Sequence, residues 1–184
     1  MSIALDPKDL ERAKRLLKGI PGGAHKAVAR ALNRTAQTTR TALSRKVTER
    51  YTVKAGDVKS SMKMTRAGKE LEARIDIESP RIDASKFKLK PRQDTTGQPN
   101  KKVTAEYLKG SPFQVKKGFI WHGHLFEREE EKRLPINKMT GPAIAQMAGS
   151  EQVIEEVEER ASDALSRNLE HEVTVLLEGW DKKK

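Results

Sequence analysis

The feature that most constrains the fold is a long helical pattern that runs from Ala24 to about Tyr51. Small and apolar residues recur along it at helical spacing. They mark one narrow stripe for burial: Ala24, Ala27, Val28, Ala31, Leu32, Ala36, Thr39, Leu43 and Val47. At 1.5 Å per residue the helix is about 40 Å long, which is longer than a small domain needs. Because its stripe consists mostly of small residues, we expect another backbone to pack closely along it.

Two further helices are predicted near the ends of the chain. Asp6 is a favourable N-cap and Pro7 suits the first helical position, so a short helix starts there and stops at Gly19. Ser150 is a candidate N-cap for a final long helix over Glu151–Glu178. The glutamates of its first turns favour the positive end of the helix dipole.

The strands lie between the long helices. Strict alternation of apolar and charged residues predicts the clearest strand at 71–77, and a shorter alternation occurs at 87–89. Strand patterns at 103–107 and 113–121 are separated by a turn at 109–112. Together these last segments predict a β-hairpin with a basic rim.

The remaining segments are short. Residues 91–102 are rich in Pro, Gly, Asn and Lys and are predicted to form a loop. We expect short helices at 55–62 and from Gly141-Pro142, and an extended segment at 134–136.

This order of elements predicts an α+β fold, with a small, largely antiparallel sheet and a basic β-hairpin between two long helices. We expect one domain over residues 1–184. It comprises N-terminal helices (1–62), a β region with the basic hairpin and loop (63–149) and an acidic C-terminal helix (150–184). Only 35% of the residues are hydrophobic and 4% aromatic. Such a thin core predicts a fold whose stability depends on an oligomeric partner.

Charge is distributed unevenly along the chain. The formal net charge is +11, but ten acids face five bases from Glu151 onward, which leaves +16 on the first 150 residues. A basic body of this kind favours a polyanion or an acidic protein surface as its partner. Two copies could also meet head to tail, with the basic body of one against the acidic arm of the other.

The sequence contains no catalytic constellation that we recognise. There is no cysteine, so disulfides and thiolate chemistry are excluded. His122 and His124 could share a metal if they lay on a strand, but no second histidine motif accompanies them, and we interpret them as part of a polar turn. We therefore predict no enzyme activity, no cofactor and no metal. No stretch approaches the length of a membrane span, so we expect no membrane contact and synthesis in the cytosol.

Basic residues are the candidate contact sites. They lie on the long helix at 24–51 and around the hairpin. Their partner is either nucleic acid or acidic protein. We favour protein, because these segments lack the aromatic residues that stack on single-stranded bases. The candidates are Arg34, Arg40, Arg45, Lys86, Lys88, Lys90, Arg92, Lys101, Lys102, Lys109, Lys116 and Lys117.

Several blocks, in order, resemble the minor tail protein Z family of phages and prophages. In the N-terminal half they are Ala31-Leu32-Asn33-Arg34, the segment 50–58 and the strand 71–75. The blocks that follow contain Phe119, Ile120, Phe126, Arg128, Leu134, Pro135, Ile136, Gly141 and Pro142. The resemblance extends from Ala24 to Val157, and the region from Lys86 to Lys117 matches the family poorly.

The resemblance implies a structural role in building a tailed phage or prophage particle. A minor tail, or tail-completion, protein of this kind acts at the head-proximal end of the tail and prepares it for head–tail joining. It is expected to form a homo-oligomeric ring and to contact the tail terminator, tail tube and head connector proteins. Assembly takes place in the host cytoplasm, and the mature location is the neck region of the virion. The competing hypothesis is a sequence-nonspecific DNA-binding accessory protein.

Overall fold

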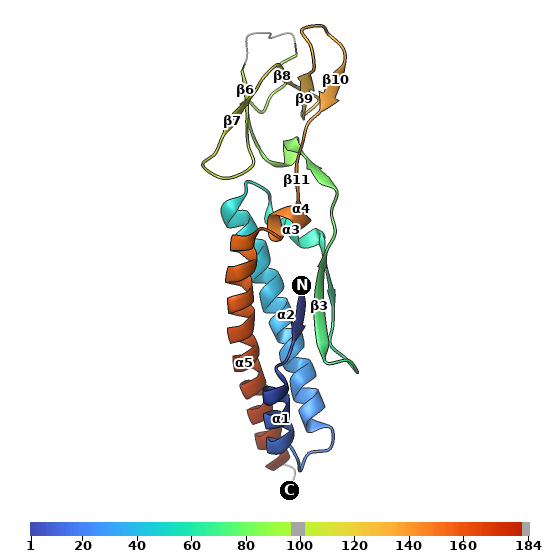
Figure 1. Cartoon of the computed structure of the whole chain (residues 1–184), viewed down its shortest axis with the longest axis vertical. Coiled ribbons are helices and arrows are strands. Elements are labelled where there is room, and N and C mark those ends of the chain that lie inside the picture. The colour runs from blue at the N-terminus through green and yellow to red at the C-terminus, as the bar shows by residue number, and fades with distance from the viewer. Residues whose placement is uncertain (97–101, 182–184) are drawn as a thin grey trace. The chain divides into compact units, whose positions relative to one another are not determined.

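The computed structural model describes residues 1–96 and 102–181, and these residues form two compact units. The first unit comprises Met1–Leu43, Met62–Ile77 and the C-terminal segment from Ile154. The second comprises Ser44–Ser61 and Glu78–Val153. Figure 1 colours the chain from the N-terminus to the C-terminus, so the three segments of the first unit appear in blue, green and red.

Helices α1 (Pro7–Leu16), α2 (Gly23–Arg50) and α5 (Glu151–Asp181) confirm the three predicted helices. Asp6 is the N-cap of α1, and its side chain accepts a 2.8 Å hydrogen bond from the backbone N–H of Lys8. Ser150 precedes α5 as predicted, but its hydroxyl donates to the carbonyl of Met147 at 2.9 Å.

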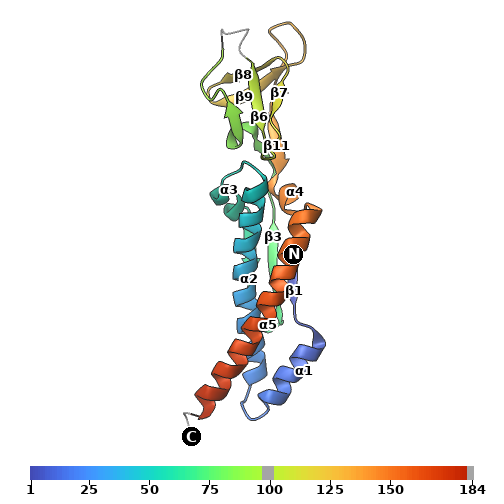
Figure 2. The same cartoon turned by 90° about the vertical axis from the view of Figure 1, so that its left-hand side faces the viewer.

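In the first unit, α2 and α5 pack side by side (Figure 1 and Figure 2). The predicted stripe of α2 is buried from Ala27 to Leu43 in this unit, and its small residues allow the close approach of the neighbouring helix. Asn168 of α5 donates a 3.0 Å hydrogen bond to the hydroxyl of Thr35, which is itself fully buried. A polar contact thus fixes the alignment of two helices whose apolar stripes alone permit sliding.

A three-stranded antiparallel sheet completes the first unit. Its order is β1 (Ser2–Ala4), β3 (Glu72–Ile77), β2 (Met62–Thr65). Strand β3 confirms the predicted strand, with Ala73 and Ile75 buried and the charged residues Arg74 and Asp76 exposed. The prediction of a helix up to Met62 was wrong at its end: α3 (Ala55–Ser60) stops earlier, and Met62 begins β2.

The second unit contains α3 and three small antiparallel sheets. One sheet has the order β5-β6-β7, another the order β10-β9-β8, and β11 pairs with β4. Their strands are β4 (Arg81–Asp83), β5 (Lys88–Lys90), β6 (Val103–Glu106), β7 (Phe113–Val115), β8 (Gly118–Trp121), β9 (His124–Arg128), β10 (Ile136–Lys138) and β11 (Thr140–Ala143). The unit also contains the 3-10 helix η1 (Ala84–Lys86) and helix α4 (Ile144–Ala148).

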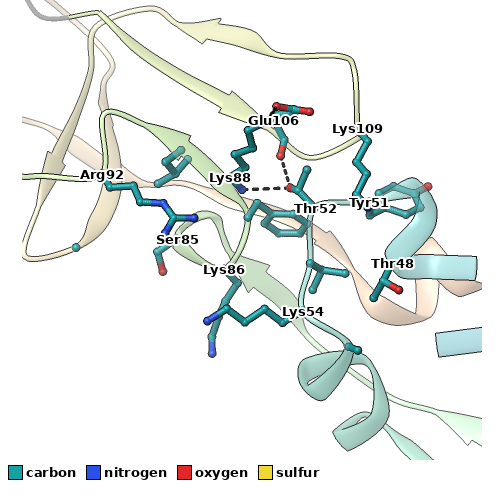
Figure 3. A pocket seen from close by; sticks show the side chains of 15 residues that line it. Thr48, Tyr51, Thr52, Lys54, Ser85, Lys86, Lys88, Arg92, Glu106 and Lys109 are labelled. Carbon is teal, nitrogen blue, oxygen red and sulfur yellow. Dashed lines mark hydrogen bonds and ion pairs between the residues drawn. The ribbon is translucent and has the colours of Figure 1, made fainter. Parts of the chain in front are cut away.

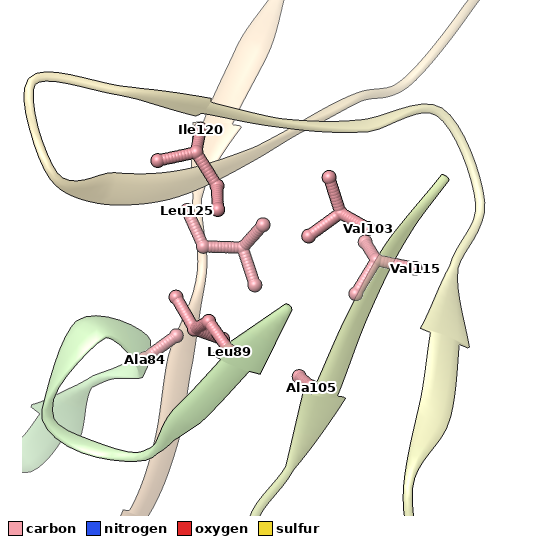
Figure 4. Close-up of a cluster of buried hydrophobic side chains, with 7 residues drawn as sticks. All are labelled: Ala84, Leu89, Val103, Ala105, Val115, Ile120 and Leu125. Atoms are coloured by element: carbon pink, nitrogen blue, oxygen red, sulfur yellow. The ribbon is translucent and has the colours of Figure 1, made fainter. Parts of the chain in front are cut away.

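The core of the second unit is a cluster of small and aliphatic side chains (Figure 4). It contains Ala84, Leu89, Val103, Ala105, Val115, Ile120 and Leu125. These residues come from η1 and from two of the sheets. The cluster therefore joins two sheets that are not hydrogen-bonded to each other as ladders.

Two predictions for the second unit need correction. The hairpin is confirmed for β6 and β7, but residues 118–121 leave it and pair with β9 in another sheet. Gly141-Pro142 was predicted to start a helix and lies instead in β11, which pairs with β4 only at its two end residues. Proline has no N–H and cannot donate a ladder hydrogen bond. Pro142 lies between the two paired residues of β11, and a strand tolerates proline at such an irregular position.

Helices account for 47% of the described residues and strands for 24%, in separate segments. The α+β fold predicted from the sequence is confirmed.

Candidate partner interface

A basic pocket of about 800 Å³ opens in the second unit (Figure 3). Its lining comes mainly from three segments: the end of α2 with the link that follows it, the η1–β5 region with Arg92, and the β6–β7 hairpin; Gly123, between β8 and β9, also contributes. Five cationic side chains line it, namely Lys54, Lys86, Lys88, Arg92 and Lys109, against the single carboxylate of Glu106. Such a concave, positively charged surface attracts anionic groups.

Hydrogen bonds around Thr52 hold the three segments together. Its N–H donates to the carbonyl of Tyr107 at 2.9 Å, and its hydroxyl donates to the carbonyl of Glu106. The same hydroxyl accepts a 3.1 Å hydrogen bond from the N–H of Lys88. The cations therefore project from a framework that is tied across more than 30 residues of sequence.

The carboxylate of Glu106 already has two partners within the chain. Its carboxylate lies 2.6 Å from the ammonium group of Lys88 and accepts a 2.9 Å hydrogen bond from the N–H of Gly110. These two hydrogen bonds lower the pKa of Glu106. Lys86 pairs in the same way with Asp57 at 3.2 Å. Among the residues that the structure describes, Lys54, Arg92 and Lys109 have no ion pair.

The structure brings four of the predicted hairpin cations into this pocket: Lys86, Lys88, Arg92 and Lys109. Lys90, Lys102, Lys116 and Lys117 are exposed but do not line it. Lys101 lies outside the described residues. Lys54 was not among the predicted contact residues, and neither were Thr52 and Glu106. The sequence placed Lys54 in an extended link after the long helix. That position gives no indication that the link runs beside the hairpin.

The predicted contact residues of α2 are placed differently. The guanidinium Nε of Arg34 lies 3.1 Å from the carboxylate of Glu172 on α5, and Arg45 pairs with Glu49 at 2.7 Å. Arg40 is half-buried. Arg34 and Arg45 thus already have carboxylate partners within the chain.

Asn33 of the Asn-Arg block has a structural contact. Its amide nitrogen donates to the carbonyl of Ala67 at 3.1 Å, and its amide oxygen accepts from the N–H of the same residue at 2.9 Å. The two hydrogen bonds fasten α2 to the connection between β2 and β3.

An aromatic patch lies on β8 and β9. The rings of Phe119 and Phe126 stack with centroids 5.7 Å apart, and the guanidinium carbon of Arg128 lies 4.3 Å from the Phe119 centroid. Trp121 packs against Phe126 at 5.8 Å and remains 42% exposed. Exposed tryptophan beside arginine is typical of the residues that contribute most to protein–protein binding.

The other motif residues lie close by in the fold. Ile120 belongs to the buried core, whereas Leu134 is 65% exposed and Pro135 is exposed beside it. Ile136 begins β10. Gly141 packs so tightly that an added Cβ would lie 2.4 Å from the Phe87 ring.

His122 and Gly123 form the two-residue turn between β8 and β9, and both have positive φ, 48° and 77°. This arrangement confirms the interpretation as a polar turn. His124 lies across the ladder from Trp121, and its Nδ1 approaches Asp83 at 2.8 Å, off the direction of a hydrogen bond. Within residues 1–96 and 102–181, no three His, Cys, Asp or Glu side chains are grouped as a metal site requires.

The two units thus define a class of protein: an α+β protein with a basic pocket and an aromatic surface patch. The chain belongs to the prophage minor tail protein Z family, whose model matches residues 8–179 of the 184. Comparisons with curated proteins and with solved structures found no significant match.

Family membership makes this a structural protein of phage tails, located in the virion and interacting with other tail proteins. In the described part of the chain, no helix is both long and apolar enough to cross a membrane.

Proposed function

We propose that this protein is a tail-completion protein that acts at the head-proximal end of the tail, in the neck of the particle. It assembles in the host cytoplasm as a homo-oligomeric ring and then contacts the tail tube, the tail terminator and the head connector. In this role the chain has no catalytic activity and needs no cofactor, and its residues 1–184 act as one domain. Family membership supports the tail role, and the contact surfaces support assembly.

Segregation of charge is the observation that carries the proposal. The basic pocket lies in the second unit, whereas acidic residues cover the start of α5. Two unlike surfaces on one chain favour heterologous contacts between copies, and such contacts close into rings when the rotation between copies permits. The aromatic patch around Trp121 supplies a further surface, of the kind that a tail protein could bind.

Native mass spectrometry of the full chain with tail tube, terminator and connector proteins from the same gene cluster tests the proposal. We expect a discrete complex that contains several copies of this chain and at least one of those proteins. A chain that stays monomeric and binds none of them refutes the tail-completion role. Cryo-electron microscopy of particles then locates the complex, and density only at the distal end of the tail contradicts the head-proximal position.

Nonspecific DNA binding is the second candidate function. The exposed lysines outside the pocket, Lys90, Lys102, Lys116 and Lys117, favour it. A protein that neutralises several phosphates loses affinity steeply as salt rises. Two results together would select this function. DNA affinity falls steeply as the salt concentration rises, and the chain binds none of the tail proteins. Contact with DNA in the channel of a ring is compatible with both.

A further inference from the structure

The basic pocket holds more positive charge than its own carboxylates neutralise. Lys86 and Lys88 each face one carboxylate, whereas Lys54, Arg92 and Lys109 are exposed and have no ion pair within the described ranges 1–96 and 102–181. Because these three cations surround a concave surface, their fields add inside it. The pocket is therefore suited to an anionic ligand with more than one charged group.

The first turns of α5 carry the opposite charge. Glu151, Glu155 and Glu159 are exposed and follow one another at four-residue intervals. They consequently lie on one face of the helix, over about 12 Å of its length. None of the three forms an ion pair with another described residue, and Arg160 is the only base between Glu151 and Ser166.

The shape of the pocket favours a peptide over a nucleic acid. A volume of about 800 Å³ admits a row of side chains. A DNA duplex carries its phosphates on a convex surface that is too wide to enter. Val53, Phe87 and Leu89 also line the pocket, and these apolar side chains suit the methylene groups of glutamate better than phosphodiesters.

We infer that the pocket binds the acidic first turns of α5 from a second copy of this chain. The inference rests on the proposed ring and identifies its subunit contact. Lys54, Arg92 and Lys109 of one copy then neutralise Glu151, Glu155 and Glu159 of the next. The contact joins two different surfaces, so an open chain of copies keeps one free pocket at one end and one free helix face at the other until the ring closes.

Charge reversal in the full chain tests the contact. The pocket variant carries Lys54→Glu, Arg92→Glu and Lys109→Glu, and the helix variant carries Glu151→Lys, Glu155→Lys and Glu159→Lys. Self-association is measured by sedimentation velocity at low salt. Each variant alone is expected to associate at least about tenfold more weakly than the natural chain, because like charges then face each other. An equimolar mixture of the two is expected to regain association, since each pocket again meets a helix of opposite charge.

A matched control separates the pocket from net charge. Lys18→Glu, Lys26→Glu and Lys63→Glu change the net charge as the pocket variant does, but at exposed sites of the first unit. This control is expected to associate like the natural chain, and thermal melts followed by circular dichroism check that every variant is folded. Equal weakening in the control, no weakening in the pocket variant, or no recovery in the mixture overturns the inference.

Two other outcomes are also decisive. If the pocket variant loses DNA affinity and keeps its self-association, the pocket is a nucleic-acid site and the inference fails. If the natural chain never self-associates yet still binds tail tube or terminator protein in native mass spectrometry, the inference fails while the tail role stands. The two proposals are thus tested separately.

Discussion

At the scale of single residues, Glu172 is a buried charge, the only one among the side chains that the structure describes. Its side chain is 3% exposed, and its carboxylate lies 3.1 Å from Arg34 and 3.6 Å from Arg30, which are each more than half exposed. A buried carboxylate is stable only when cations or hydrogen bonds compensate its lost hydration. The arginine of the Asn-Arg block therefore stabilises the packing of α5 on α2.

Because Glu172 is buried and Arg34 is exposed, substituting Arg34 is expected to destabilise the protein more than substituting Glu172. Arg34→Met leaves the buried carboxylate without its nearer cation, and we expect it to lower the free energy of unfolding by about 2 kcal/mol. Glu172→Gln leaves only exposed arginines, which water can solvate, so about 1 kcal/mol or less is expected. Urea unfolding of the full chain measures both. Arg45→Met, which breaks the exposed pair with Glu49, is the control and should cost much less than Arg34→Met. Equal losses for Arg34→Met and Arg45→Met would contradict this account.

Gly141 illustrates a steric requirement at one residue. Phe87 is buried, and its ring occupies the space that a Cβ at Gly141 would need. Gly141→Ala is therefore expected to lower the free energy of unfolding by about 1 to 3 kcal/mol through overpacking. The matched control is Gly56→Ala in α3, where an added Cβ meets no atom within 4 Å. This control should be neutral or slightly stabilising. The explanation fails if thermal melts show equal effects for the two substitutions.

At the scale of elements, Asp83 joins strands that belong to different sheets. It ends β4, and its carboxylate accepts a 2.9 Å hydrogen bond from the N–H of Ser85 and lies 2.6 Å from the ammonium group of Lys138 in β10. His124 of β9 lies 2.8 Å from the same carboxylate. Burial raises the pKa of Asp83, but hydrogen bonds from Lys138 and Ser85, together with the charge of His124, bring it down to about 2.

A lowered pKa predicts how stability depends on pH. The pKa of Asp83 falls from 3.8 to about 2 on folding, so its contribution is complete well above pH 3.8 and is lost as the pH falls towards 2. Asp83→Asn should therefore cost about 1 to 2 kcal/mol at neutral pH and almost nothing near pH 2. Urea unfolding across this pH range measures the difference. The control, Asp163→Asn at an exposed site of α5, should show no such dependence. A cost for Asp83→Asn that stays constant with pH would refute the assignment.

At the scale of the whole molecule, each of the two units buries its own apolar side chains, and many of these are alanine or valine. The cluster of the second unit consists only of alanine, valine, leucine and isoleucine. The buried stripe of α2 mixes alanine, valine and leucine with threonine and serine. Small side chains bury little apolar area each, so contacts with other copies or other tail proteins would add substantially to stability.

If copies of the chain stabilise one another, the melting temperature must depend on concentration. We expect it to rise measurably over about a hundredfold increase in protein concentration, because association stabilises the folded state by mass action. The charge-reversed pocket variant should lose this dependence. Differential scanning calorimetry measures both. A melting temperature that is independent of concentration would show that each chain is stable without a neighbour.

Local patterns identified much of this fold before its tertiary structure was known. The long helices at 24–51 and 151–178 and the strand at 71–77 follow from periodicity, because each side chain's direction depends on the geometry of its own backbone. Gly141-Pro142 was assigned wrongly, since the same dipeptide suits the start of a helix or an irregular strand. The pairing with β4, which is distant in sequence, makes it a strand.

The candidate site required the tertiary structure. The sequence by itself determined that the body is basic, that the last helix is acidic and that the hairpin is rich in lysine, because charge is a property of composition. Only the fold decided that Lys54 joins Lys86 and Lys109 around one pocket, and that Arg34 turns to Glu172. Those positions depend on contacts such as the hydrogen bonds of Thr52, which link residues far apart along the chain. No local pattern records contacts of that kind, since they depend on how separate elements pack.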